Sequence, residues 1–168
     1  YDMFWGTAAE IGLPISLHSA SERRVARPKT PLEQFLRYTA AHHAIIGLIY
    51  GGLFDRFPGL QVVSAENDAG WAGNIIERMD FFYAEAPARK LRDPNDAIMN
   101  KQLPSHYWHN NVAYTFMRDM TAVAARNVIG TDRIMWSSDF PHNNSTWPDS
   151  QEIIAKHMVG VPLDEQRM

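Results

Sequence analysis

Residues 133–139 read RIMWSSD, and this short stretch decides the fold that we expect for the chain. Its apolar residues, 134–136, have the composition of a buried strand in a parallel sheet whose faces are covered by helices. The stretch nevertheless ends in a carboxylate, that of Asp139. Packing gives a buried strand no reason to end in an ionisable group, so this ending calls for a chemical explanation.

Three earlier stretches share this β-rich composition, and a helical pattern follows each of the four. The earlier stretches are residues 14–18 (PISLH), 60–66 (LQVVSAE) and 111–116 (NVAYTF). We expect a long helix from Pro31 that Phe57-Pro58-Gly59 stops, and further helices over 71–83, over 117–127 and from about residue 147. Strands that alternate with helices predict parallel pairing through right-handed crossovers.

Four such units predict an α/β fold that is part of a (β/α)8 TIM barrel. A complete barrel takes about 250 residues, and this chain has 168. A complete doubly wound sheet is the competing fold, although neither G-x-G-x-x-G nor G-x-x-x-x-G-K-[ST] occurs. Both ends of the chain read as if they lay inside helices. We therefore expect residues 1–168 to form a single domain, the C-terminal half of a barrel whose N-terminal half is absent.

The composition narrows the classes of partner. The chain is 45% hydrophobic and has a formal net charge of −3, whereas a nucleic-acid partner usually requires a basic patch. It contains no apolar run near the ~20 residues of a membrane span, so we expect a cytoplasmic protein without a membrane partner. It also contains no cysteine, so any bound metal must be held by His, Asp or Glu side chains.

Ionisable side chains end three of the four predicted strands: His18, Glu66 and Asp139. In parallel α/β folds the carboxyl ends of the strands face the active site, so these groups are expected to converge there. The neutral imidazole of His18 is a suitable zinc ligand, and the Asp139 carboxylate can bind the metal or take a proton from metal-bound water. Each also has a structural alternative: a histidine bonded to a loop carbonyl, and a turn aspartate bonded to its own backbone.

Two further groups of residues lie on the same predicted rim. His142, three residues after Asp139, can hydrogen-bond a substrate or water, or brace its own loop. The loop after His18 carries Arg23, Arg24 and Arg27, whose guanidinium groups can bind a substrate carboxylate through paired hydrogen bonds. A solvated loop surface is the simpler interpretation of these arginines, which we keep as candidates for substrate binding.

Three motifs together resemble the amidohydrolase-related family that includes aminocarboxymuconate-semialdehyde decarboxylase. GTDRIMWSSDFPH (residues 130–142) resembles its last-strand motif, FDRFPGLQVVSAENDAGW (54–71) its helix-to-sixth-strand signature, and PISLHSA (14–20) its fifth strand. The resemblance implies that the chain covers roughly strands 5 to 8. It also implies that His18 is the fifth-strand metal ligand and Asp139 the eighth-strand ligand.

The chain departs from the family pattern in two places. The first-strand His-x-His pair, which supplies two more ligands, has no counterpart here and would precede Tyr1. The decarboxylases of the family carry a histidine acid/base on the sixth strand, where this chain has Glu66. The second departure argues against decarboxylase chemistry.

The function that we expect is that of an enzyme with one divalent metal, zinc or alternatively manganese. The metal lowers the pKa of a bound water toward ~7, and Asp139 or Glu66 moves the proton. The first hypothesis is hydrolysis of a small carbonyl or carboxylate compound. The alternatives are non-oxidative decarboxylation of an aromatic or unsaturated acid, and a catalytically inactive fragment that only packs. The partners expected are a small-molecule substrate and, for the full-length protein, a second copy in a homodimer.

Overall fold

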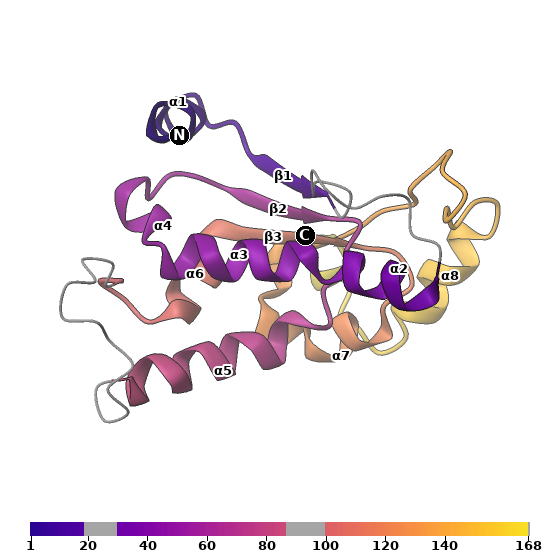
Figure 1. Cartoon of the computed structure of the whole chain (residues 1–168). Coiled ribbons are helices and arrows are strands. Elements are labelled where there is room, and N and C mark those ends of the chain that lie inside the picture. Colours follow the sequence, from indigo (N-terminus) through magenta and orange to yellow (C-terminus); the bar gives the residue numbers. More distant parts are fainter. Residues whose placement is uncertain (19–29, 87–99, 168) are drawn as a thin grey trace.

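A parallel four-stranded sheet forms the centre of the molecule (Figure 1). The computed structural model describes residues 1–18, 30–86 and 100–167, without the side chain of Arg37. The strands are β1 (Ile15–His18), β2 (Val62–Ala65), β3 (Val112–Phe116) and β4 (Ile134–Trp136). Their order in space is their order in the chain. This is the order of a barrel wall, whereas a doubly wound sheet reverses direction at a switch point.

Helices connect the strands and cover one face of the sheet. In the described parts of the chain they are α1 (Asp2–Glu10), α2 (Pro31–Tyr38), α3 (Ala40–Tyr50), α4 (Leu53–Arg56), α5 (Ala72–Glu85), α6 (Pro104–Asn111), α7 (Met120–Ile129) and α8 (Ser150–His157). Short 3-10 turns span Thr131–Arg133 and Glu165–Arg167. None of these helices is long and apolar enough to cross a membrane.

The two faces of the sheet differ in burial. Side chains alternate along a strand, and Val62, Val112, Tyr114 and Phe116 point to the face that is buried. Figure 1 shows α3, α5 and α7 on one side of the sheet. The opposite face carries seven residues that are all partly buried or exposed: Ser16, His18, Val63, Ala65, Ala113, Thr115 and Met135.

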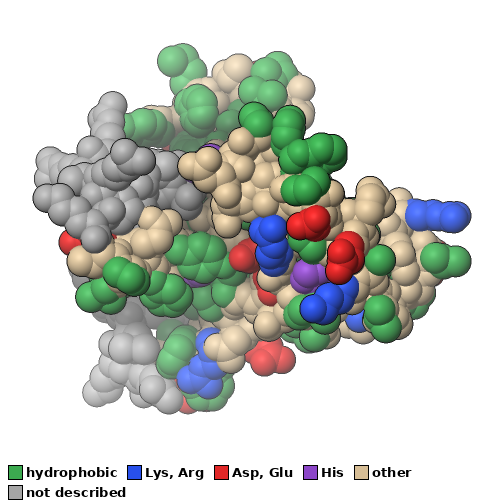
Figure 2. Space-filling view, turned by 90° about the vertical axis from the view of Figure 1, so that its right-hand side faces the viewer, with side chains coloured by type: hydrophobic (Ala, Val, Ile, Leu, Met, Phe, Trp, Pro, Cys, Tyr) green, Lys and Arg blue, Asp and Glu red, His purple; other side chains and the backbone are tan. Residues whose placement is uncertain are grey.

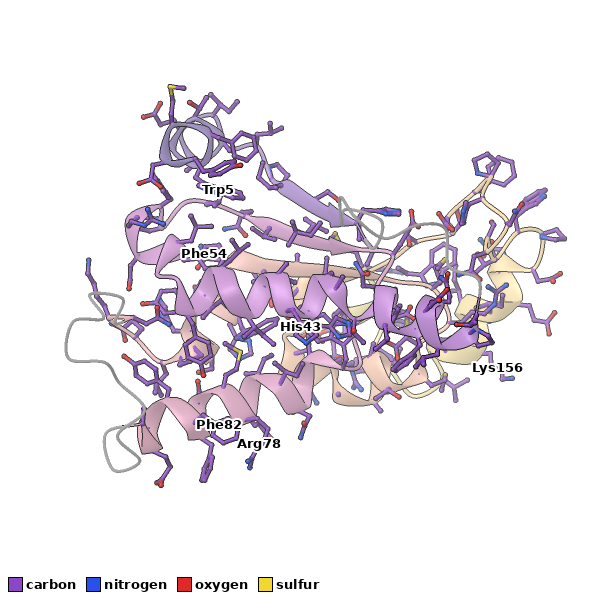
Figure 3. All side chains as sticks on the ribbon, in the orientation of Figure 1. Trp5, His43, Phe54, Arg78, Phe82 and Lys156 are labelled. Atoms are coloured by element: carbon purple, nitrogen blue, oxygen red, sulfur yellow. The ribbon has the colours of Figure 1, made fainter. Side chains whose placement is uncertain are left out.

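Aromatic rings build much of the core between sheet and helices. The ring of Trp108 stacks on that of Tyr114 with centroids 6.2 Å apart, and Trp71 meets both edge-on. In Figure 3 Arg78 and Phe82 project from the outer side of α5, away from the sheet. The buried aromatic residues thus fix α5 and α6 against β3, which positions the loop that begins α5.

The structure corrects two expectations about element boundaries. The single helix expected from Pro31 is three helices, α2, α3 and α4. The last break falls at Gly52, whose φ of 64° lies in the left-handed region that glycine adopts without a Cβ penalty. Asn111, expected to open the third strand, instead ends α6, and its amide donates to the carbonyls of Pro58 and Leu60 at 2.9 and 2.8 Å.

Candidate active site

Three ionisable side chains emerge at one edge of the sheet. His18 is the last residue of β1, Glu66 directly follows β2, and Asp139 lies three residues after β4. Because the strands are parallel, all of these positions belong to the carboxyl edge, toward which the strand arrows of Figure 1 point. Figure 2 views the molecule from this side and shows acidic, basic and histidine side chains gathered on it.

Short contacts link the candidate residues. His18 Nε2 lies 2.9 Å from Glu66 Oε2. His142 Nδ1 lies 2.8 Å from Asp139 Oδ2, and the His142 side chain is 62% exposed while that of Asp139 is 9% exposed. Glu66, Asp139 and His142 each offer one ligand atom, and these atoms all lie within 4.8 Å of one another. His18 is outside that group of three and meets it through Glu66. The structure therefore brings together the four candidates that lie in its described part.

The backbone is strained at two of these residues. Among the described residues, the only non-glycine residues with positive φ are Glu66 (59°), Asp68 (53°) and Asp139 (54°). A side chain in the left-handed region costs about 1–3 kcal/mol and persists only where its surroundings hold it. Such strain gathers at functional sites, and here it turns Glu66 and Asp139 out of the regular strand direction.

Asn67 holds the turn that follows β2. Its side chain is fully buried, and Nδ2 donates to the carbonyls of Leu17 at 3.3 Å and Ala65 at 2.6 Å. Trp71 Nε1 in turn donates to the carbonyl of Asn67 at 3.0 Å. One amide thus ties together the ends of β1 and β2, immediately before His18 and Glu66 emerge.

Two aspartates that the sequence analysis did not single out stabilise the same turn. Asp119 accepts hydrogen bonds from the amides of Ala69 at 2.9 Å, Gly70 at 2.6 Å and Ala122 at 2.9 Å. Gly70 is required there, because an added Cβ would lie 2.7 Å from Asp119 Oδ1. The position of Asp119 before an apolar run is a helix N-cap signal that could have identified it.

Asp68 is the second of these aspartates, and it lies among uncharged partners. It accepts hydrogen bonds from Met117 N at 3.3 Å and from the Tyr38 hydroxyl at 3.5 Å. Burial raises the pKa of Asp68, and burial together with the Asp68 charge raises the pKa of Tyr38. This contact joins residues far apart in the chain, so local sequence patterns give no sign of it.

The structure does not test the three arginines that were predicted to bind substrate. Arg23, Arg24 and Arg27 lie outside the described residues. Arg118, which the sequence analysis did not consider, donates from Nη1 to Asn144 O and from Nη2 to Ser145 O, both at 3.1 Å. It therefore braces the loop that begins at Asp139.

The donor set suits a divalent cation. The site offers carboxylate oxygens from Glu66 and Asp139 and imidazole nitrogens from His18 and His142, which are ligands that zinc and manganese both accept. Two carboxylates this close repel each other unless positive charge lies between or beside them. The arrangement can therefore hold a cation while one carboxyl or imidazole remains to move a proton.

Comparisons with known proteins show the family and the fold. A family model described as "Amidohydrolase" matches residues 1–168. Gamma-resorcylate decarboxylase of Rhodococcus jostii (strain RHA1) is 25% identical over an alignment 175 residues long, and this alignment takes in 91% of this chain and 48% of that protein. The chain therefore spans about half the length of this curated relative.

Solved structures show the same fold. An amidohydrolase from Mycobacterium avium subsp. paratuberculosis K-10 matches 99% of this chain and 42% of its own, with a TM-score of 0.76 and 24% identity. The 2,6-dihydroxybenzoate decarboxylase from Rhizobium matches 99% of this chain and 51% of its own, with a TM-score of 0.70 and 19% identity. A dihydroxybenzoic acid decarboxylase from Polaromonas sp. JS666, with bound manganese and the inhibitor 2-nitroresorcinol, matches 99% and 50%, with a TM-score of 0.66 and 18% identity. These likenesses confirm the expected partial (β/α)8 barrel.

Proposed function

The chain belongs to the amidohydrolase family, and from this premise we propose that it is part of a metal-dependent decarboxylase that acts on a hydroxylated aromatic acid. Three of the relatives described above are decarboxylases of such acids. They favour the decarboxylase alternative over the hydrolysis that we expected first. This chain has Glu66 where the decarboxylases of the family carry a histidine. In this proposal the Glu66 carboxyl takes over the role of acid from that imidazole.

The observation that supports this proposal best is the convergence of Glu66, Asp139 and His142, with His18 2.9 Å from Glu66. We assign His18 and Asp139 as metal ligands, and Glu66 and His142 as groups that act on protons or substrate. A divalent cation held there supplies positive charge that orients a substrate carboxylate or phenolate oxygen. The manganese in the Polaromonas enzyme makes manganese a candidate beside zinc.

The chemistry assigned to Glu66 is general acid catalysis. Its carboxyl donates a proton to the ring carbon that bears the substrate carboxylate. The bond from that carbon to the carboxylate then breaks, its electron pair returns to the ring, and CO2 leaves. One proton is consumed in each turnover, and Glu66 regains it from solvent. Asp139 is nine-tenths buried and hydrogen-bonded to His142, so its carboxyl has a fixed position, and we assign it to the metal instead of to proton transfer.

Three further expectations belong to this proposal. The arginines at 23, 24 and 27 are candidates to attract the substrate carboxylate, because guanidinium groups bind carboxylates through paired hydrogen bonds. The homodimer and the cytoplasmic location remain predictions.

The deciding experiment compares two reactions in the intact protein. The protein is stripped of metal, reloaded with Mn²⁺ or Zn²⁺, and incubated with 2,6-dihydroxybenzoate and other hydroxybenzoates, while CO2 release and the decarboxylated product are measured. A parallel panel of lactones and amides tests hydrolysis. We expect metal-dependent CO2 release that is lost in Glu66→Gln. Hydrolysis without CO2 release would overturn the proposal in favour of a hydrolase, and inactivity toward both panels would support the inactive alternative.

A further inference from the structure

Thr115 makes a contact with the candidate acid that the regular sheet does not require. The backbone N–H of Glu66 donates to Thr115 Oγ1 at 3.1 Å. Ala65 is the last residue of β2, so the regular strand ends directly before this donor. A partly buried backbone N–H without a partner is costly, and here the hydroxyl of the neighbouring strand accepts its hydrogen bond.

The side chain of Thr115 is on the same face of the sheet as the site. Its neighbours Tyr114 and Phe116 are buried against the helices, so Thr115 points to the opposite face, and it pairs with Met135 of β4. His18 and Ala65, paired with each other in the adjoining strands, belong to that face too. The hydroxyl therefore lies on the side of the sheet from which His18 emerges.

The contact fixes a backbone conformation that needs support. Glu66 has a φ of 59°, a left-handed conformation that a glutamate rarely adopts. The buried side-chain amide of Asn67 donates to the carbonyls of Leu17 in β1 and Ala65 in β2, so it supports the turn that contains Glu66. Only Thr115, among the described residues, accepts the hydrogen bond of the Glu66 amide itself.

We propose that Thr115 is a positioning residue, which aims the Glu66 carboxyl by holding the Glu66 backbone amide. This inference rests on the proposed function, because it gives Glu66 the role of acid. The direction of the Cα–Cβ bond follows the backbone angles, so loss of this hydrogen bond lets the carboxyl leave the position in which it meets His18. Small displacements of a catalytic group reduce the rate strongly.

Two substitutions separate positioning from ordinary packing. Thr115→Val keeps the shape of the side chain and removes the acceptor, whereas Thr115→Ser keeps the acceptor and removes a methyl group. We expect kcat to fall about 10-fold or more in Thr115→Val, with KM and bound metal nearly unchanged, and to stay within about 2-fold of wild type in Thr115→Ser. If Thr115 only packs, kcat will instead follow the melting temperature, and the serine variant will be the slower of the two.

A double-mutant cycle tests whether Thr115 acts through Glu66. In the Glu66→Gln background, Thr115→Val should cause no further loss of kcat, because the group that it positions no longer donates a proton. A full additional loss would overturn the inference. Tyr114→Phe is the matched control, since it removes a hydroxyl from the adjacent residue on the opposite face, and it should leave kcat unchanged.

An activity-independent measurement keeps this inference separate from the proposed function. Amide hydrogen exchange of Glu66, followed by NMR, should be slow in wild type and Thr115→Ser and about 10-fold faster or more in Thr115→Val. Equal exchange in both variants would overturn the inference whatever the reaction is. If wild type releases no CO2 from any hydroxybenzoate, the proposed function fails, and the exchange comparison still decides whether Thr115 holds Glu66.

Discussion

His18 Nε2 lies 2.9 Å from Glu66 Oε2, so the last residue of one strand meets the first residue after the next. His18 pairs with Ala65 in the sheet, so the side chains of His18 and of the next residue, Glu66, both lie at the carboxyl edge. An imidazole and a carboxyl in this arrangement can share a cation or a proton. Metal binding by His18 and proton donation by Glu66 can each be measured.

Replacing His18 in the intact protein tests the metal assignment. We expect His18→Ala to weaken metal binding about 100-fold or more, because one protein ligand is lost, and to abolish turnover. Bound metal is measured by elemental analysis after dialysis. His106→Ala is the control, since His106 is exposed on α6, which leads into the amino end of β3. If His18→Ala keeps both metal and rate, the strand-end residues revert to structural roles.

Replacing Glu66 tests the acid. Glu66→Gln keeps the size of the side chain and removes the transferable proton, so kcat for CO2 release should fall about 10²–10⁴-fold while the metal is retained. Glu66→His should release CO2 faster than Glu66→Gln, because an imidazole can also donate a proton. Unchanged CO2 release in Glu66→Gln would remove Glu66 from the reaction.

His42 predicts a pH dependence of the free energy of unfolding. Its ring is buried and stacks on that of Trp71 at 3.7 Å; burial, with a smaller effect of His43, lowers the pKa of His42 to about 4. The unfolded chain, with an ordinary value of about 6.5, binds more protons between these pH values. The free energy of unfolding should therefore fall as the pH falls from about 6.5 to 4, by about 1–2 kcal/mol after allowance for solvent screening.

The measurement for His42 is urea unfolding at several pH values in wild type and His42→Phe. The phenylalanine keeps the stacking on Trp71 and cannot be protonated, so its stability should depend less on pH over this interval. Identical pH profiles in the two proteins would show that His42 does not titrate differently on unfolding.

Asp119 predicts a large stability effect from one carboxylate. It caps α7 and also holds the amides of Ala69 and Gly70. Asp119→Ala should lower the free energy of unfolding by about 2 kcal/mol, since it removes a helix cap and leaves loop amides without an acceptor. Asp119→Asn, which keeps an acceptor oxygen, should lose less. Denaturant unfolding measures both, and equal small losses would contradict the assignment.

The sequence was sufficient to predict the strands and the rim, because both follow from local patterns. An apolar run that ends in His18, Glu66 or Asp139 shows the strand and the end at which the polar group lies. The left-handed turn at Glu66 could not be predicted, since nothing in ENDAG requires positive φ at a glutamate. The hydrogen bond from Glu66 to Thr115 depends on the register between β2 and β3, which exists only in the folded sheet.

The order of the strands has a consequence for how the chain folds during synthesis. Each strand pairs with the one made directly before it, as Ile15 does with Val62 and Val62 with Val112. Among the four described strands, β2, β3 and β4 are therefore each made after a strand with which they pair, and none waits for a partner beyond the next βα unit. Pairing between successive strands keeps the sequence separation of these contacts lower than another strand order would, which favours faster folding, and chains generally fold from the N-terminal end as they are made. The sheet can grow one βα unit at a time. The hydrogen bond from the Glu66 amide to Thr115 forms only after β3 has joined β2.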